Sequence, residues 1–294
     1  MIDLSDFYKE VENKKIFIQR NFVRVLRLVN RCIPCNIKKK NQSDYAYVTI
    51  CRQSDFDMVK ASLFTLYKNA TVVPNKVIIV SDGTWNVEDG IKCFSKLKVN
   101  VECIMWTICA DFYKQTCPSL SVWASKHIWG KKMAAILYLS EKQAILFSDP
   151  DILWYGDPIS SQEVNTLKFK VSVDNCHSYD QDCIKTLDLG ELNEREPINC
   201  GAVYMHGGLP LLDRKCIECI DYEAEHCGNF AEQTVFGVMD LVYNSRWKME
   251  QISSRVDDVI APFLSKNDRG TIARHYLWRL KWIYWKEVFK MYFS

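Results

Sequence analysis

The sequence predicts an α/β protein in which a mainly parallel, twisted sheet carries helices on both of its faces. Strand-like and helix-like segments alternate from about residue 45 onward, which is typical of parallel strands joined by helices. Two acidic residues, Asp82 and Asp149, fall at the ends of predicted strands, where such sheets bind their ligands. The 294 residues, of which 48% are hydrophobic, suffice for one large domain or for two small ones.

The first half of the chain contains four of the predicted strands. Residues 1–40 precede them and predict an N-terminal helical extension, because apolar residues recur there at helical spacing with lysines and arginines between them. Short apolar runs predict strands at 45–51, at 76–81, at 99–106 and in the run that leads to Asp149. Between the last two strands we expect a loop over 107–120 and a helix over 122–140.

The second half is less regular. Strands are predicted at 168–174 and 198–206, and helices at 211–224 and 231–243. The chain then ends in a stretch that mixes Trp, Tyr and Phe with Lys and Arg, which predicts a C-terminal aromatic and basic helix.

An apolar run near the middle of the chain ends in two aspartates, Asp149 and Asp151. Residues two apart on a strand point to the same side, so both carboxylates can converge on one point. Carboxylates this close repel each other unless a cation lies between them, and a hard divalent ion is the natural partner. Because such ions usually also hold phosphates, the pattern predicts an enzyme that handles a nucleotide diphosphate.

A third ligand is available near the C-terminus. His275 lies six residues before Lys281. Histidine is a common ligand of Mn²⁺ and a poor one of Mg²⁺. Lys281 can supply a point charge to a diphosphate. The expected cofactor is therefore Mn²⁺, with Mg²⁺ as the alternative.

These residues carry a resemblance to a known family. The segment Phe147–Pro158 resembles the Asp-x-Asp segment of nucleotide-diphospho-sugar transferases of the GT-A fold. The segment from His275 to Lys281 resembles the His-x-x-Gly-x-x-Lys-Pro-Trp motif of the retaining glycogenin and galactosyltransferase-like families. Two departures stand out: Trp278 occupies the position of the glycine, and Trp282 follows the lysine with no proline between them.

The resemblance implies a set of site residues between about 45 and 282. Asp149, Asp151 and His275 would bind the metal; Thr49, Cys51, Asp82, Lys132, Asn199, Gly201 and Lys281 would contact the donor; and Gln233, Glu232 and Asp174 would act at the reacting centre. Several of them also have a structural alternative. Asn199 and Gly201 would suit a tight turn, and Glu232 would suit the positive end of a helix dipole. Lys132 would suit the exposed face of a helix.

The implied activity is the metal-dependent transfer of a sugar, with retention of configuration, from a nucleotide diphosphate. A UDP-sugar is the expected donor, and a hydroxyl of a glycan or lipid-linked glycan is the expected acceptor. In this scheme residues 41–294 form a single domain of GT-A type, with a nucleotide-binding half at 41–154 and an acceptor half with the C-terminal helix at 155–294.

Two other functions remain open. A strand that ends in Asp-x-Asp also opens the haloacid-dehalogenase-like phosphatases, although their motif normally lies near the start of the chain. Trp278 at the glycine position, and Glu232 where the family has an aspartate, would suit a non-catalytic module that only binds sugar nucleotides.

Composition limits the partners and the location. A formal net charge of +2 gives no argument for nucleic acid as a partner. No apolar run has the length of a membrane span, and the start of the chain does not resemble a signal peptide, so a cytoplasmic location is expected. The basic and aromatic terminal segments suit either packing or an anionic membrane surface, which would place the protein at the inner membrane face.

The chain has 13 cysteines, an odd number, and a disulfide framework is not expected in the cytoplasm. The Cys-x-x-Cys pairs Cys32/Cys35 and Cys216/Cys219 leave a zinc site open as an alternative to reduced, buried thiols.

Overall fold

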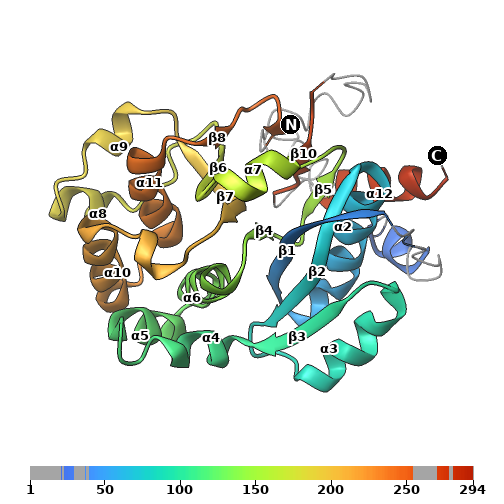
Figure 1. Ribbon diagram of the computed structural model, residues 1–294, viewed down its shortest axis with the longest axis horizontal. Coiled ribbons are helices and arrows are strands. Elements are labelled where there is room, and N and C mark those ends of the chain that lie inside the picture. The colour runs from blue at the N-terminus through green and yellow to red at the C-terminus, as the bar shows by residue number, and fades with distance from the viewer. Residues whose placement is uncertain are drawn as a thin grey trace, which may run out of the picture.

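A sheet of seven strands forms the centre of the computed structural model, which describes residues 21, 23–29, 37, 40–253, 270–277 and 281–293 (Figure 1). The strand order is β3-β2-β1-β4-β7-β6-β8. Their bounds are β1 Asn41–Cys51, β2 Val72–Ser81, β3 Val101–Met105, β4 Ile145–Ser148, β6 Phe169–Val173, β7 Ile198–Met205 and β8 Arg246–Trp247. All neighbouring strands in this sheet run parallel except that β7 is antiparallel to both β4 and β6. The prediction of a mainly parallel sheet is confirmed.

Helices cover both faces of this sheet, as predicted (Figure 1). Their bounds are α2 Phe56–Asn69, α3 Val87–Phe94, α4 Trp106–Phe112, α5 Pro118–Lys126, α6 Ile128–Lys142, α7 Ser161–Thr166, α8 Gln181–Thr186, α9 Glu191–Glu194, α10 Arg214–His226, α11 Ala231–Tyr243 and α12 Lys281–Tyr292.

Strand β1 shows how the two layers arise from its sequence. Successive strand residues point to opposite faces. Ala46 and Val48 belong to the hydrophobic core beneath α4, α5, α6, α10 and α11, whereas Tyr45 and Tyr47 belong to the core beneath α2 and α3. The strand is buried on both faces from Tyr45 to Cys51, as expected for the centre of a parallel sheet.

The loop predicted over 107–120 is wrong, and so is the single helix predicted over 122–140. Helix α4 occupies the first part of that loop, and α5 starts inside it at Pro118, a residue that favours the first helical position. The chain is extended at His127, whose side chain accepts a hydrogen bond from the N–H of Trp129 and caps α6. A Cβ on Gly130 would lie 2.4 Å from the backbone of Trp123, so the glycine allows α5 and α6 to pack closely.

A second, smaller sheet joins distant parts of the chain in the order β5-β10-β9. It contains β5 (Ile152–Trp154), β9 (Ile252–Ser253) and β10 (Ala273–His275). Strand β10 runs antiparallel to β5, with His275 opposite Ile152. This pairing brings the C-terminal region back to the end of β4.

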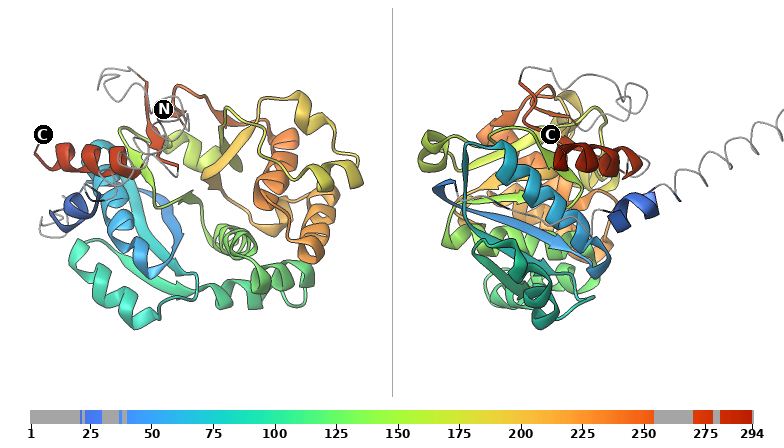
Figure 2. Two further views of the ribbon diagram at one scale, coloured as in Figure 1. Left: turned by 180° about the vertical axis from the view of Figure 1, so that it is seen from behind. Right: turned by 90° about the vertical axis from the view of Figure 1, so that its right-hand side faces the viewer.

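The C-terminal helix α12 lies against α2 (Figure 2). Its Tyr284 and Trp285 are buried, and the hydroxyl of Tyr284, which has one proton to donate, lies between the carbonyl oxygens of Met58, at 2.8 Å, and Pro150, at 3.2 Å. Leu26, in the helical residues 23–29, belongs to the same hydrophobic cluster. Apart from residues 21, 37 and 40, the remainder of the predicted N-terminal extension lies outside the described residues, as do Cys32, Cys35 and Trp278. Among the helices that the structure describes, none combines the length and the apolar character that crossing a bilayer requires.

Candidate metal centre

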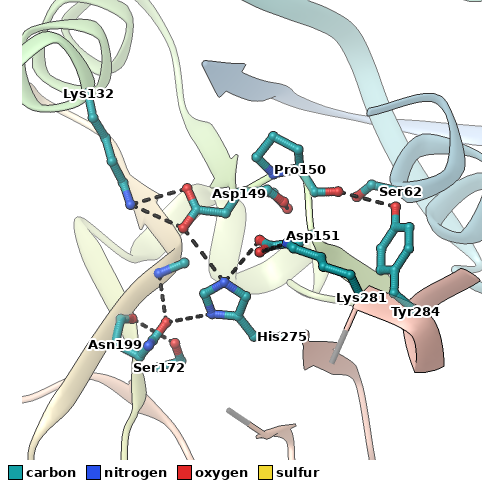
Figure 3. A network of polar contacts seen from close by, with 12 residues as sticks. Ser62, Lys132, Asp149, Pro150, Asp151, Ser172, Asn199, His275, Lys281 and Tyr284 are labelled. Carbon is teal, nitrogen blue, oxygen red and sulfur yellow. Dashed lines mark hydrogen bonds and ion pairs between the residues drawn. The ribbon is translucent and has the colours of Figure 1, made fainter. Parts of the chain in front are cut away.

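The end of β4 and the end of β10 bring Asp149, Asp151 and His275 together (Figure 3). The N–H of Asp149 donates to the carbonyl of Gly201 at 2.7 Å, which ties the aspartate to β7. The N–H of Tyr276 donates to the carbonyl of Asp151 at 3.0 Å, which continues the β5–β10 pairing. One potential ligand atom from each of the three side chains lies within 4.8 Å of the others.

The chemistry of this group suits a divalent metal ion. His275 Nε2 lies 3.0 Å from Asp151 Oδ1 and 3.8 Å from Asp149 Oδ2. Two carboxylates and one imidazole form a mixed oxygen and nitrogen set, which first-row divalent ions accept. Within the described part of the chain this is the one His, Cys, Asp and Glu group close enough to hold a metal, so Cys216 and Cys219 form no such site there.

Two lysines already approach these carboxylates. Lys132 on α6 lies 3.2 Å from Asp149 Oδ1 and 3.7 Å from Glu232 Oε1, and Lys281 at the start of α12 forms an ion pair with Asp151. Burial opposes the charge of Lys132, but Asp149 and Glu232 raise its pKa above the ordinary value. Burial likewise opposes ionisation of Asp151, but His275 and Lys281 hold its pKa below the usual range. The site is therefore built to keep Asp151 and Lys132 charged.

Glu232 stands on the other side of Lys132, in the first turn of α11. Burial raises the pKa of its carboxyl, and Lys132 reduces that effect. Its Oε1 faces Lys132, whereas its buried Oε2 has no hydrogen-bond partner among the described residues. A buried acceptor without a partner is costly, so this oxygen is suited to a donor group supplied by a ligand.

A cavity of about 200 Å³ opens beside the metal centre. It is lined by Ile50, Cys51, Arg52, Asp55, Asp82, Ile128, Trp129, Lys132, Asp149, Pro150 and Glu232. Five predicted site residues are in this lining: Cys51, Asp82, Lys132, Asp149 and Glu232.

Arg52 and Trp129 also line the cavity, although no sequence motif pointed to them. Arg52 directly follows the end of β1, and its guanidinium lies 3.9 Å from the carboxylate of Asp82. Trp129 lies three residues before Lys132 on α6, a spacing that places both on one side of the helix. The position of Arg52 directly after β1, and that of Trp129 three residues before Lys132, could both have been recognised in the sequence.

Other predicted site residues do not line this cavity. Thr49 is fully buried on β1, and its hydroxyl has no partner among the described residues. Gln233 is buried, and its amide donates to the carbonyl of Ile198. Asp174 and Asn199 are 7% exposed and hydrogen-bond to each other.

Gly201 has a steric role next to the metal centre. A Cβ at this position would lie 2.5 Å from Nδ1 and Cε1 of His275. The absence of a side chain on β7 therefore allows the imidazole ring to lie directly against the strand.

Comparisons with known proteins bear on the fold alone. No protein-family model matches this chain, and no curated protein sequence matches it. The solved structure of mouse xyloside xylosyltransferase 1 in its apo form is similar, with a TM-score of 0.53 and 12% sequence identity over 81% of this chain and 99% of that chain. At this identity the likeness concerns the fold alone, and it confirms a GT-A-type glycosyltransferase fold.

Two weaker likenesses are to the WbbM bifunctional glycosyltransferase and to galactosyltransferase LgtC. The WbbM match has a TM-score of 0.48 and 12% identity, and it covers 88% of this chain and 53% of that chain. The LgtC structure, solved with donor and acceptor sugar analogues, has a TM-score of 0.47 and 10% identity over 79% of this chain and 87% of that chain.

Proposed function

We propose that this protein is a metal-dependent glycosyltransferase that moves a sugar from a UDP-sugar to a hydroxyl of a glycan or lipid-linked glycan. The observation that carries the proposal is the convergence of Asp149, Asp151 and His275 beside a cavity, at the carboxyl end of β4 in a GT-A-type fold. Ligands of such sheets bind at this edge.

The metal would be held by the two aspartates and the histidine. We propose Mn²⁺ rather than Mg²⁺, because an imidazole nitrogen is one of the three ligand atoms. A divalent ion bound there would offset the negative charge that develops on the leaving diphosphate.

Two lysines would share the stabilisation of the leaving diphosphate. Lys132 lines the cavity, and Lys281 forms an ion pair with Asp151, a residue of the metal centre. Fixed positive charges at a developing anion lower the barrier most when they are already in place and shielded from water. Lys132 meets both conditions, because it is 6% exposed and held between two carboxylates.

The stereochemical outcome and the acceptor are also part of the proposal. We propose retention, as the resemblance of the two sequence motifs implies, through a front-side displacement with Gln233 near the reacting centre. Glu232 is the cavity-lining acid with an unpartnered oxygen, and we propose that this oxygen accepts a hydrogen bond from a donor-sugar hydroxyl. The acceptor would then enter beside Trp129.

An anionic membrane surface as a partner also remains a proposal. Tyr284 and Trp285 are buried with side chains of α2 and β5, but Val25, Leu28 and Phe293 are exposed on the described terminal segments.

The first experiment is a thermal-shift screen of UDP-, GDP- and CMP-sugars with and without Mn²⁺. A ligand that binds the folded protein stabilises it, by about 2.7 kcal/mol at a concentration of 100 Kd. We expect stabilisation by a UDP-sugar that depends on the metal. Stabilisation by a UDP-sugar that is the same with and without Mn²⁺ would refute the metal site.

The second experiment measures UDP release from the donor that the screen identifies. Asp151→Asn should lower turnover by about a hundredfold or more, the usual scale for losing one electrostatic element of an active site. Asp111→Asn, on an exposed residue of α4, is the matched control and should leave turnover unchanged. Binding without turnover would indicate a non-catalytic binding module, and phosphate release from simple monoesters would indicate a phosphatase.

A further inference from the structure

Strand β7 is irregular at the place where it passes His275. Its pairing with β6 jumps from Val171 opposite Val203 to Ser172 opposite Asn199. Such irregularities re-aim side chains next to active sites. Here the irregularity turns the side chain of Asn199 toward His275, and the hydroxyl of Ser172 donates to the carbonyl of Asn199 at 2.7 Å, which holds the backbone in place (Figure 3).

The amide of Asn199 can have only one orientation. One end of it lies 2.8 Å from the backbone N–H of Gly201, which can only donate, so this end is the oxygen Oδ1. The other end lies 3.0 Å from Asp174 Oδ2, a carboxylate oxygen that accepts, so this end is the NH₂ group. The contacts with Gly201 and with Asp174 therefore give the same assignment of the amide oxygen and nitrogen of Asn199.

This orientation decides which nitrogen of His275 carries the proton. His275 Nδ1 lies 3.0 Å from Asn199 Oδ1, an oxygen that can only accept. Nδ1 of the neutral imidazole is thus the protonated nitrogen. Nε2 keeps its electron pair, and it faces Asp151 Oδ1 at 3.0 Å. An electron pair aimed at a carboxylate is unfavourable unless a cation lies between them.

We propose that Asn199, held by Asp174 and Gly201, is a positioning residue that fixes His275 in the Nδ1–H tautomer and so presents Nε2 to the metal. All three side chains of this chain of contacts are buried, with His275 at 5% exposure and Asn199 and Asp174 at 7% each. The role differs from the donor contact that the sequence predicted for Asn199 and from the role at the reacting centre predicted for Asp174. Removing the residue that hydrogen-bonds to the non-ligating nitrogen of a metal-binding histidine typically changes metal affinity ten- to a hundredfold.

The tautomer can be measured directly in the metal-free protein. The chain has 5 histidines, so a ¹⁵N-histidine-labelled sample gives few ring signals, and a His275→Gln variant assigns the relevant one. At pH 8 we expect Nδ1 of His275 to carry a proton; without a metal, Nε2 can carry a second proton toward Asp151. The neutral form with its proton on Nε2 alone, or an even mixture of the two neutral forms, would overturn the proposal whatever the activity of the protein.

Metal affinity provides the second test, with Mn²⁺ alone as the probe and electron paramagnetic resonance as the readout. Asn199→Leu removes the acceptor for Nδ1–H and should weaken Mn²⁺ binding ten- to a hundredfold. The double variant Asn199→Asp/Asp174→Asn exchanges the two side chains. The carboxylate at 199 still accepts from His275 and Gly201, and the amide at 174 now donates to it. Mn²⁺ affinity should therefore return to within about threefold of the wild type. If Asn199→Leu fails to fold, the Mn²⁺ affinity of the double variant and the protonation of the His275 ring still test the positioning role of Asn199.

The inference rests on the metal site of the proposed function, but the two can fail separately. No Mn²⁺ binding by the wild type, with or without UDP, would overturn both. Normal Mn²⁺ binding by a folded Asn199→Leu variant would overturn the positioning role alone. Absence of sugar transfer, with the expected tautomer and affinities, would overturn the activity alone.

Discussion

Two groups of acids in this protein, one partly buried and one buried, have opposite electrostatic surroundings. In the metal centre, Asp149 and Asp151 are paired with Lys132, Lys281 and His275. The second group, which we call the α10 acid pair, consists of Glu223 on α10 and Asp180, the residue that caps α8.

No described lysine, arginine or histidine forms an ion pair with the α10 acid pair. Glu223 is fully buried, and its Oε2 accepts one hydrogen bond from the N–H of Gly228 at 2.9 Å, whereas its Oε1 has no partner in the described chain. Asp180 uses Oδ1 to accept from the N–H groups of Asp182 and Cys183.

The pKa values move in opposite directions as a result. Burial raises the pKa of Glu223 to about 7, and the nearby Asp180 adds to the effect. Burial acts in the same direction on Asp151, but His275 and Lys281 outweigh it and lower its pKa. Burial of an acid therefore does not by itself indicate a metal or a catalytic site; the cations placed around it do.

The largest expected effect comes from removing a cation of the metal centre. Lys132→Met leaves Asp149 and Glu232 facing each other without a positive charge, because Lys132 is what separates them. Breaking a buried ion pair from one side typically costs about 3–5 kcal/mol. We expect a loss of this size in the free energy of unfolding, measured by urea denaturation in the presence of a chelator.

Two variants control that measurement. Lys92→Met, at an exposed position of α3, should change the free energy of unfolding by less than about 0.5 kcal/mol. Adding Glu232→Gln to Lys132→Met should recover part of the loss, since one of the two opposed charges is removed. A cost below about 1 kcal/mol for Lys132→Met would remove the contrast between the two acid groups.

The second prediction concerns the pH dependence of stability. Glu223 has a pKa of about 7 in the folded protein against an ordinary value of 4.5, so the folded state binds the proton more tightly. The stabilisation is complete below pH 4.5 and is lost as the pH rises toward 7. At 1.36 kcal/mol per pKa unit the difference amounts to about 3 kcal/mol.

Glu223→Gln isolates this contribution. An amide keeps an acceptor for the N–H of Gly228 but does not titrate in this range. Urea unfolding at pH 5 and pH 8 should show the wild type losing about 2.5 kcal/mol relative to the variant between the two values. Parallel pH profiles for the two proteins would mean that Glu223 is ionised in the fold and that Asp180 has no influence on it.

The sequence predicted the sheet better than the site. The alternating strands and helices and the end of β4 at the two aspartates follow from local apolar runs. The contact of His275 with Asp151 depends on a strand of only three residues, β10, which has no pattern of its own. It became predictable only through the spacing to Lys281 that the resemblance supplied.

The rest of the site depends on tertiary features that local patterns do not encode. The irregular pairing of β7 decides that Asn199 faces His275. The close contact at Gly201 is visible only once the imidazole is in place. Helix α4 was missed because its buried residues, Cys109 and Ala110, are too few to show a helical period. The roles predicted for the site residues stay predictions, and two of these residues, Thr49 and Gln233, do not line the cavity.

The smallest predicted effect lies in the loop between α10 and α11, which begins four residues after Glu223. Cys227 ends α10 with a left-handed backbone, at φ 51°, and its N–H donates to the carbonyl of Glu223 at 2.9 Å. A residue with a Cβ pays about 1–2 kcal/mol in this conformation, whereas glycine does not. Part of the gain is offset because glycine makes the unfolded chain more flexible. We therefore expect Cys227→Gly to stabilise the protein by about 0.5–1 kcal/mol in urea unfolding.

Cys227→Ala separates the backbone from the thiol, because alanine keeps the Cβ in the left-handed conformation and should bring no gain. Cys227→Gly leaves the N–H of Gly228 and its acceptor Glu223 unchanged, so the pH dependence of unfolding should match that of the wild type. A gain in stability that varied between pH 5 and pH 8 would show that the end of α10 and the α10 acid pair form one coupled unit. A constant gain would assign the effect to the backbone of Cys227 and leave the charge environment as the difference between the two acid groups.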